Sequence, residues 1–320
     1  MRILVTGGLG FIGSNFINLI APKAEVEAII NLDAGTYAAN SNNIDENARK
    51  SGKYKLYLGN VCDADLVGKI IEMENIDTIV HFAAESHVDR SIENASVFIE
   101  TNVLGTFTLL DQANRKWKSY DGKRFLHIST DEVFGSLDLL DPPFRKTNPY
   151  APNSPYAASK ASADLICRSF YKTHGFPVMI TNCSNNYGPR QYPEKLIPLA
   201  LSRLKEGKQV PVYGDGSNIR DWIYVEDHCV RLWQVLKLGN FGGQYLIGGN
   251  NEVSNLWLVR ILCKMMNKSP DDHICFVPDR KGHDFRYAID TTDFDATFGK
   301  LPYTPVEDGL KQTIAWYVRD

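Results

Sequence analysis

Two short strings in this chain combine side chains that can move protons. Tyr156 and Lys160 are four residues apart, and residues with this spacing share one face of a helix. A nearby ammonium favours the phenolate form of a tyrosine, whose unperturbed pKa is about 10, so this pair predicts a base that acts on a hydroxyl group. The string Thr130-Asp131-Glu132 places a hydroxyl beside two carboxyl groups. An acid and a base side by side are typical of an elimination.

The elements around these strings indicate how they meet. Phe125–Thr130 is predicted as a buried strand, so the two carboxyl groups are expected at its carboxyl end. The Pro-rich segment Asp138–Pro155 follows, and a long loop of this kind is more often functional than filler. A helix is predicted next, at Ser159–Thr173. We therefore predict that the catalytic residues are Thr130, Asp131, Glu132, Tyr156 and Lys160.

A glycine pattern near the N-terminus indicates a dinucleotide site. Gly7, Gly10 and Gly13 form G-x-x-G-x-x-G between a predicted strand and a predicted helix. Such a turn lets backbone N–H groups and the helix N-terminus approach a pyrophosphate. Asp33 ends the next predicted strand, where a carboxylate binds the ribose hydroxyls and repels a 2′-phosphate. The pattern therefore predicts NAD rather than NADP.

Strand-like and helix-like segments alternate in the first half of the chain, which is typical of a doubly wound parallel sheet. Buried strands are predicted at Arg2–Thr6, Ala28–Asp33, Lys55–Asn60, Thr78–Ala84, Phe125–Thr130 and Val178–Cys183. Helices are predicted at Ser14–Ile20, Ala64–Met73, Ile92–Lys116 and Ser159–Thr173. The predicted fold class is α/β, with a Rossmann-type sheet.

The pattern becomes mixed after residue 189, which indicates a smaller α+β substrate-binding lobe. Helices are predicted there at Glu194–Glu206 and Asn255–Met266, and strands at Val210–Tyr213, Gln244–Ile247 and Ile274–Val277. We predict that residues 1–184 form the NAD-binding domain, with 214–240 returning to it. Residues 185–213 and 241–320 are predicted to form the lobe.

Composition argues against several classes of protein. The 320 residues are 43% hydrophobic and 23% charged, as in ordinary globular proteins, and the net charge of −3 argues against nucleic-acid binding. No apolar run approaches the length of a membrane span. The N-terminus leads directly into a predicted strand, without room for a signal peptide. The six cysteines form no C-x-x-C pair, so we expect reduced thiols, no metal site and a cytoplasmic protein.

Longer strings resemble one family of the extended short-chain dehydrogenase/reductase superfamily. Residues 83–91 (AAESHVDRS), 129–135 (STDEVFG), 182–189 (NCSNNYGP), 193–198 (PEKLIP), 219–222 (IRDW) and 279–284 (DRKGHD) are similar to the dTDP-glucose 4,6-dehydratases. The resemblance implies oxidation at C4 of a nucleotide-linked glucose, loss of water across C5 and C6, and hydride return to C6. It implies that Tyr156 takes the hydroxyl proton, Glu132 takes the C5 proton, and Asp131 protonates the departing 6-hydroxyl.

The resemblance also extends the two predicted binding sites. The predicted cofactor site comprises Gly7, Gly10, Phe11, Ile12, Gly13, Asp33, Ala34, Thr36, Asn60, Val61, Phe82, Ala83, Ala84, Thr101, Tyr156, Lys160 and Asn186. The predicted substrate site comprises Ser86, Thr130, Asn185, Lys195, Leu196, Pro211, Tyr213, Arg220, Asn255, Arg280 and His283. Ala34 and Asn60 stand where the family usually has Lys and Asp, which implies weaker cofactor binding.

Alternative interpretations stay open at this point. A UDP-hexose 4-epimerase or a UDP-glucuronate decarboxylase on the same scaffold shares the glycines and the Tyr-x-x-x-Lys pair but lacks the Asp-Glu pair. A catalytically silent NAD-binding regulator tends to lose the tyrosine or the lysine, and this chain has both. The substrate is expected to be dTDP-glucose or UDP-glucose.

The resemblance further implies a homodimer with a four-helix seam built from Ile92–Lys116 and Ser159–Thr173. The apolar residues expected there are Val97, Phe98, Leu104, Phe107, Leu110, Leu165 and Phe170, which exceed what one sheet face needs. The alternative is that all of them pack on the sheet of their own subunit.

Overall fold

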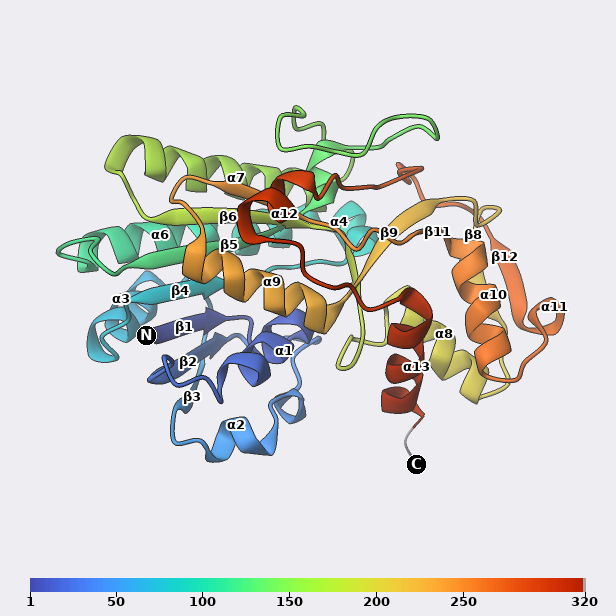
Figure 1. The fold of residues 1–320 in the computed structure, drawn as a ribbon, viewed down its shortest axis with the longest axis horizontal. Helices are drawn as coiled ribbons and strands as arrows, with labels where there is room; N and C mark the ends of the chain where they lie inside the picture. The colour runs from blue at the N-terminus through green and yellow to red at the C-terminus, as the bar shows by residue number, and fades with distance from the viewer. Residues whose placement is uncertain (319–320) are drawn as a thin grey trace.

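The computed structural model describes residues 1–318, and a seven-stranded parallel sheet forms its centre (Figure 1). The strand order is β10-β6-β5-β4-β1-β2-β3. Chain order therefore reverses between β1 and β4, and ligands of such sheets bind where the carboxyl ends of the strands meet this reversal. The strands are β1 (Arg2–Thr6), β2 (Ala28–Asp33), β3 (Tyr54–Leu58), β4 (Thr78–His81), β5 (Arg124–Thr130), β6 (Val178–Cys183) and β10 (Gln244–Ile247).

Helices cover both faces of this sheet. Phe16 and Ile17 of α1 and Leu232 of α9 pack in one apolar cluster, whereas Val67 of α3 and Leu109 of α6 pack in a second cluster with Cys167 of α7. Strands that are buried on both faces appear in the sequence as continuous apolar runs. This is why strand-like segments could be told apart from the helix-like segments between them. The helices are α1 (Phe11–Ile20), α2 (Glu46–Lys50), α3 (Ala64–Met73), α6 (Gly105–Lys116), α7 (Pro155–His174) and α9 (Val225–Leu238).

One long helix predicted at Ile92–Lys116 is interrupted in the structure. The chain forms α4 (Val88–Glu93), α5 (Ala95–Phe98), a π-helical segment, η2 (Ile99–Leu104), and then α6. Asn102 lies in the π-helical segment, where its amide accepts from Glu85 N at 2.8 Å and donates to Glu85 O at 3.0 Å and to Ser159 Oγ at 2.8 Å. The wider turn thus fixes the loop after β4, and π-helical turns often occur at functional sites.

The smaller lobe occupies the right-hand side of Figure 1. It contains a three-stranded sheet, β11-β9-β7, and a two-stranded parallel sheet, β12-β8. Tyr187, Leu201, Trp222 and Leu258 belong to its apolar core. The elements are β7 (Asn185–Tyr187), α8 (Leu196–Lys205), β8 (Val210–Tyr213), β9 (Ile219–Tyr224), β11 (Glu252–Ser254), α10 (Asn255–Met265), α11 (Pro270–His273), β12 (Ile274–Val277) and α13 (Val306–Tyr317).

The placement of Gln244–Ile247 in the smaller lobe was wrong. This strand, β10, pairs with β6 in register from Gln244 to Ile247 and extends the large sheet, because its side chains Tyr245, Leu246 and Ile247 are buried there. A later helix, α12 (Thr292–Phe298), packs against β10 and α9 as well. Helix α9 does return to the large sheet, as predicted, whereas β9 belongs to the three-stranded sheet. The other domain boundaries stay predictions.

Candidate active site

A cavity of about 360 Å³ lies at the carboxyl ends of β1, β2, β4 and β5. Each of the five predicted catalytic residues lines it, and so does every residue of the predicted cofactor site. Four residues of the predicted substrate site share this lining, namely Ser86, Thr130, Asn185 and Lys195. The strand order brings these distant segments together, because β1 and β4 are neighbours at the point of reversal.

The glycine turn forms part of the cavity wall, and its backbone packs too closely against neighbouring backbone for larger residues. Gly7 has φ of +69°, and a Cβ atom there would lie 2.7 Å from the Cα of Ala83. A Cβ at Gly13 would lie 2.5 Å from the carbonyl oxygen of Gly7. Helix α1 begins directly after Gly10 without a side-chain cap, so the backbone N–H groups of its first turn remain available for an anion. The turn therefore fits a pyrophosphate.

Asp33 stands at the end of β2 with its carboxylate fixed by the backbone. Its two oxygens accept hydrogen bonds from Leu9 N and Gly35 N, both at 2.9 Å. A carboxylate has about four acceptor positions, so each oxygen can still accept from a ribose hydroxyl. Asn31 was not predicted, although its Oδ1 accepts from Gly8 N at 3.0 Å and fixes the same turn. These residues fit the adenosine half of a dinucleotide.

Asp131 and Glu132 begin a short 3-10 helix, η3 (Asp131–Phe134). Thr130 caps it, accepting from Glu132 N and donating to Asp131 Oδ1, both at 3.3 Å. Asp131 is only 1% exposed, and its Oδ2 has no hydrogen-bond partner within residues 1–318. Burial raises the pKa of Asp131 well above its ordinary value, and the nearby Glu132 and Asp221 carboxylates raise it further. Asp131 is thus suited to hold a proton and donate it.

Glu132 has different surroundings. It is half-buried, and burial raises its pKa, but the guanidinium of Arg220 and the ammonium of Lys195 oppose that rise. The pKa values of both carboxyl groups are raised, that of Asp131 more strongly. The cations of the smaller lobe make Glu132 the better proton acceptor of the two.

Tyr156 and Lys160 lie one turn apart on α7 and both line the cavity. Lys160 is 4% exposed, and its Nζ donates to the carbonyl oxygen of Ile128 at 2.7 Å. Burial raises the pKa of Tyr156 well above its ordinary value, and Glu132 raises it further. The spacing of Tyr156 and Lys160 predicted a lowered pKa for the tyrosine, and that direction was wrong. Burial and neighbouring acids outweigh a cation that is bound to a backbone carbonyl.

Three cations of the predicted substrate site already have partners. Lys195 Nζ donates to Ser86 O at 2.9 Å, and Arg280 Nε lies 2.7 Å from Asp89 Oδ1. The buried guanidinium of Arg220 donates to backbone carbonyls, among them Asp284 O at 2.9 Å. Arg220 and Arg280 do not line the cavity, yet both lower the pKa of Glu132.

The other predicted substrate residues lie farther along the smaller lobe. The rings of Tyr213 and His283 meet edge-on with centroids 6.1 Å apart, and the guanidinium of Arg280 lies 5.4 Å from the Tyr213 ring. These three side chains form one cluster on the smaller lobe. Leu196, Pro211 and Asn255 lie at α8, β8 and α10, outside the cavity lining.

Three side chains that were not predicted as site residues join the two lobes, and one of them, Glu194, lines the cavity. Tyr37 Oη donates to Glu194 Oε1 at 3.1 Å, and Arg90 Nη2 lies 3.6 Å from Glu194 Oε2. Arg90 also stacks over the Tyr37 ring at 3.7 Å. Glu194 was part of the quoted PEKLIP string, but nothing in the sequence links it to Tyr37 or Arg90.

Two further features concern the described residues as a whole. Within residues 1–318 no helix combines the length and apolar character needed to span a bilayer. The same residues contain no cluster of three or more His, Cys, Asp or Glu side chains placed to hold a metal ion.

Comparison with known proteins identifies the family. Residues 4–313 match the family described as GDP-mannose 4,6 dehydratase. A dTDP-glucose 4,6-dehydratase of Neisseria meningitidis serogroup B is 45% identical, over 99% of this chain and 93% of that relative. The chain belongs to the dTDP-glucose 4,6-dehydratase family.

Solved structures agree with this family assignment. The dTDP-glucose 4,6-dehydratase DesIV of Streptomyces venezuelae, determined with NAD bound, superposes with a TM-score of 0.92 at 44% identity and covers 99% of this chain and 97% of its own. A UDP-glucose 4-epimerase of Thermotoga maritima has a TM-score of 0.89 and covers 99% and 98% of the two chains, but at only 25% identity. The fold is thus shared with epimerases, whereas the sequence is nearer to dehydratases.

Proposed function

We propose that this chain is a nucleotide-sugar 4,6-dehydratase that converts dTDP-glucose to the 4-keto-6-deoxy sugar with NAD bound. The observation that carries this proposal is the pair Asp131 and Glu132, which share one cavity with Tyr156 and the glycine turn. An alcohol oxidation needs the tyrosine and the cofactor, but not a proton-holding acid beside a base. The family relatives, including one solved with NAD, support the same activity.

The glycine turn and Asp33 are placed to hold the cofactor. Gly7, Gly10 and Gly13 would receive its pyrophosphate at the start of α1, and Asp33 would bind the adenosine ribose. The nicotinamide half would extend toward Tyr156 and Lys160, which line the same cavity. NAD supplies an acceptor for the hydride of the sugar and a donor for its return.

The chain's own residues supply the proton transfers. Tyr156 takes the proton of the 4-hydroxyl, and Thr130 lowers the pKa of Tyr156 against the effect of burial. A ketone at C4 makes the C5 proton acidic, and Glu132 accepts that proton. Asp131 donates its proton to the 6-hydroxyl, which leaves as water and opens C6 to hydride.

The smaller lobe is proposed to bind the diphosphate and the nucleoside. Lys195, Arg220 and Arg280 carry the positive charge that a diphosphate requires, and all three lower the pKa of Glu132, which supports this assignment. The Tyr213 and His283 rings are proposed to contact the base. The substrate phosphates would then replace Ser86 O as the partner of Lys195, and Asp89 as the partner of Arg280.

We also propose a cytoplasmic location and a homodimeric assembly. A cytoplasmic location is supported by the six cysteines, all of which are free thiols. A homodimer is supported by the exposed apolar side chains Val97, Leu104, Phe107 and Leu165 on the predicted seam helices. Phe98 and Leu110 were expected in that seam, but they are 2% and 0% exposed inside the subunit.

A parallel incubation tests the function and the nucleoside preference together. The purified protein is supplied with dTDP-glucose, UDP-glucose and GDP-mannose, and the ultraviolet absorbance of a 4-keto sugar is followed in alkali. We expect the fastest product formation from dTDP-glucose. An epimerised sugar, or no turnover of any of the three sugars, would contradict the proposal.

A further inference from the structure

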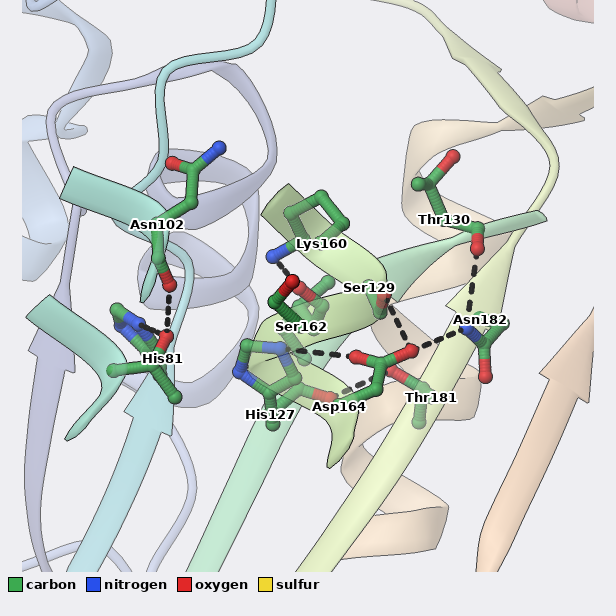
Figure 2. A network of polar contacts seen from close by, with 12 residues as sticks. His81, Asn102, His127, Ser129, Thr130, Lys160, Ser162, Asp164, Thr181 and Asn182 are labelled. Atoms are coloured by element: carbon green, nitrogen blue, oxygen red, sulfur yellow. Dashed lines mark hydrogen bonds and ion pairs between the residues drawn. The ribbon is translucent and has the colours of Figure 1, made fainter. Parts of the chain in front are cut away.

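One side of the cavity, formed by β5, β6 and α7, is fixed by buried contacts. Figure 2 shows the carboxyl group of Asp164 on α7 pointing toward Ser129 of β5 and Asn182 of β6, and hydrogen bonds of 3.0 and 3.1 Å join these side chains. Lys160 Nζ donates to the carbonyl oxygen of Ile128 at 2.7 Å in the same region. Because the helix and both strands are tied together here, we expect a ligand to enter and leave on another side.

Loops form another side of the cavity. The loop 34–40 follows β2, the loop 82–87 follows β4, and the segment 190–195 leads into α8. The three loops contribute the lining residues Thr36, Ala38, Ala39, Phe82, Ala83, Ala84, Glu85, Ser86, Gln191, Tyr192, Glu194 and Lys195. Contacts between these loops therefore decide whether this side of the cavity is open or closed.

The tip of the loop after β2 is attached to the smaller lobe by a side chain. At the far end of this loop Asn40 N donates to Leu9 O at 3.1 Å, and the tip closes on itself through a bond of 3.0 Å from Ala39 N to Thr36 O. Tyr37 lies between these last two residues and reaches from the tip to the segment 190–195.

Tyr37, Arg90 and Glu194 form a closed set of contacts, which we call the clasp. Tyr37 Oη donates to Glu194 Oε1 at 3.1 Å, the Arg90 guanidinium covers the Tyr37 ring at 3.7 Å, and Arg90 Nη2 lies 3.6 Å from Glu194 Oε2. The Tyr37 ring also meets the ring of Tyr192 edge-on, with centroids 5.4 Å apart. The clasp thus joins α4 and the loop after β2 to the segment 190–195.

The start of the segment 190–195 is held more firmly than the clasp. The guanidinium of Arg190 donates to Asn15 Oδ1 at 2.9 Å, to Asn43 O at 3.0 Å and to Asp45 Oδ1 at 2.6 Å. Glu194 Oε2, by contrast, has no hydrogen-bond partner within residues 1–318, and its ion pairs are 3.6 and 3.8 Å long. The segment therefore has a fixed end at Arg190 and a more easily released end at Glu194.

Two members of the clasp lie outside the cavity lining. Tyr37 and Arg90 do not line the cavity, although residues on both sides of Tyr37 do. Their side chains therefore give little direct contact to a ligand inside. What they can change is the separation of the loop after β2 from the segment 190–195.

We propose that the clasp holds the cavity closed over a bound NAD and sets the rate at which the dinucleotide enters and leaves. The loop that carries Tyr37 directly follows Asp33, which is placed to bind the adenosine ribose, so release of Tyr37 would free the wall beside that ribose. Slow release keeps the reduced cofactor in place between two hydride transfers. The inference rests on the proposed cofactor site but not on the sugar chemistry, because exchange of NAD is measured without any sugar.

The first test measures how fast bound NAD exchanges. Purified protein carrying NAD is mixed with an excess of isotopically labelled NAD, free nucleotide is removed at intervals, and the bound label is measured by mass spectrometry. Tyr37→Phe removes only the hydroxyl that donates to the Glu194 carboxylate. We expect exchange to become about 10-fold faster, the scale on which loss of one hydrogen bond to a charged group acts. Arg90→Gln, which removes the other contacts of the clasp, should accelerate exchange as well.

The second test separates passage from binding. The Kd for NAD is measured by calorimetry on protein freed of nucleotide. Because Tyr37 lies outside the cavity lining, Tyr37→Phe should leave the Kd close to that of the wild type, so that association and dissociation accelerate together. In a Glu194→Ala background, Tyr37→Phe should accelerate exchange no further, since the hydroxyl has already lost its acceptor.

The matched control is Asp45→Asn. It breaks an ion pair of 2.6 Å that holds the same segment through Arg190, and neither residue lines the cavity. Its exchange rate should equal that of the wild type.

Three results would overturn the clasp. They are unchanged exchange in both Tyr37→Phe and Arg90→Gln, equal acceleration by Asp45→Asn, and a weaker Kd with an unchanged association rate, which would make Tyr37 a binding residue. A protein that takes up no NAD would overturn the cofactor site itself, and the clasp with it.

Discussion

Asp131 and Glu132 are neighbours in the sequence, yet their surroundings divide two tasks between them. Asp131 lies against the end of β5, with one oxygen near Thr130 and the other without a hydrogen-bond partner among the described residues. Cations of the smaller lobe, by contrast, lower the pKa of Glu132. The same residue type could not serve both roles in one environment, because an acid must retain a proton that the base must have lost.

Replacement of Glu132 by Gln separates these two tasks. Glu132→Gln keeps the size of the side chain and removes only the base for the C5 proton, so oxidation at C4 should proceed while elimination stops. We expect product formation to fall by about 100- to 10,000-fold, with reduced cofactor accumulating on the protein after dTDP-glucose is added. Absorbance of the bound cofactor and release of the 4-keto product are measured together. Product formation at the wild-type rate would show that another group is the base.

The sequence predicted the identity of these residues better than their proton affinities. The spacing of Tyr156 and Lys160 correctly indicated one helix face, but it carried no information on how far Glu132 and burial raise the pKa of Tyr156. Asp164 also lies four residues beyond Lys160. Its hydrogen-bond donors, Ser129 of β5, Tyr150 of the Pro-rich segment and Asn182 of β6, became visible only in the structure.

Elements with a simple apolar pattern were the easiest to predict. Arg2–Thr6, Ala28–Asp33, Ala64–Met73 and Val178–Cys183 have the predicted bounds, because each shows a continuous or one-sided apolar pattern. The interrupted helix before α6 was missed, since a π-helical turn depends on the contact of Asn102 with Glu85 rather than on local periodicity. The assignment of β10 failed for a related reason: three consecutive apolar residues identify a strand but not the sheet that it joins.

The helices on one face of the sheet leave an apolar surface for a second subunit. Leu104, Phe107 and Leu165 are 47%, 43% and 56% exposed on neighbouring elements, and α6 packs beside α7. Phe107 meets the partly buried Phe170 edge-on at 6.2 Å, which joins the two helices across their exposed side. A surface of this kind favours a symmetric dimer in which each subunit contributes both helices.

Charged substitutions on this surface test the dimer. We expect light scattering to give the mass of a dimer for the wild-type protein and of a monomer for the double variant Leu104→Glu/Phe107→Glu, since burying two carboxylates opposes association. Leu238→Glu is the matched control, because Leu238 is 66% exposed on α9, across the sheet from the seam. A wild-type monomer at micromolar concentration, or a double variant that remains dimeric, would contradict this assembly.

Both lobes of the molecule contribute residues to the active-site cavity. The large sheet supplies the cofactor turn and the catalytic residues, and the smaller lobe supplies Asn185, Lys195 and Glu194 to the same cavity. Contacts of Tyr37 and Arg90 with Glu194 connect the lobes. Enclosure matters because the hydride that leaves C4 must return to C6 of the same sugar. A cofactor that departed in between would leave the ketone without a reductant and the protein without an oxidant.

The most direct test of this account is the fate of hydrogen from C4. dTDP-glucose carrying deuterium at C4 is incubated with the purified protein without added NAD, and the product is analysed by NMR and mass spectrometry. We predict a 4-keto-6-deoxy sugar with the deuterium at C6 and none of it in the water. Deuterium lost to water, deuterium found on reduced cofactor free in solution, or a product unlabelled at C6 would contradict the internal oxidation, elimination and reduction proposed for this chain.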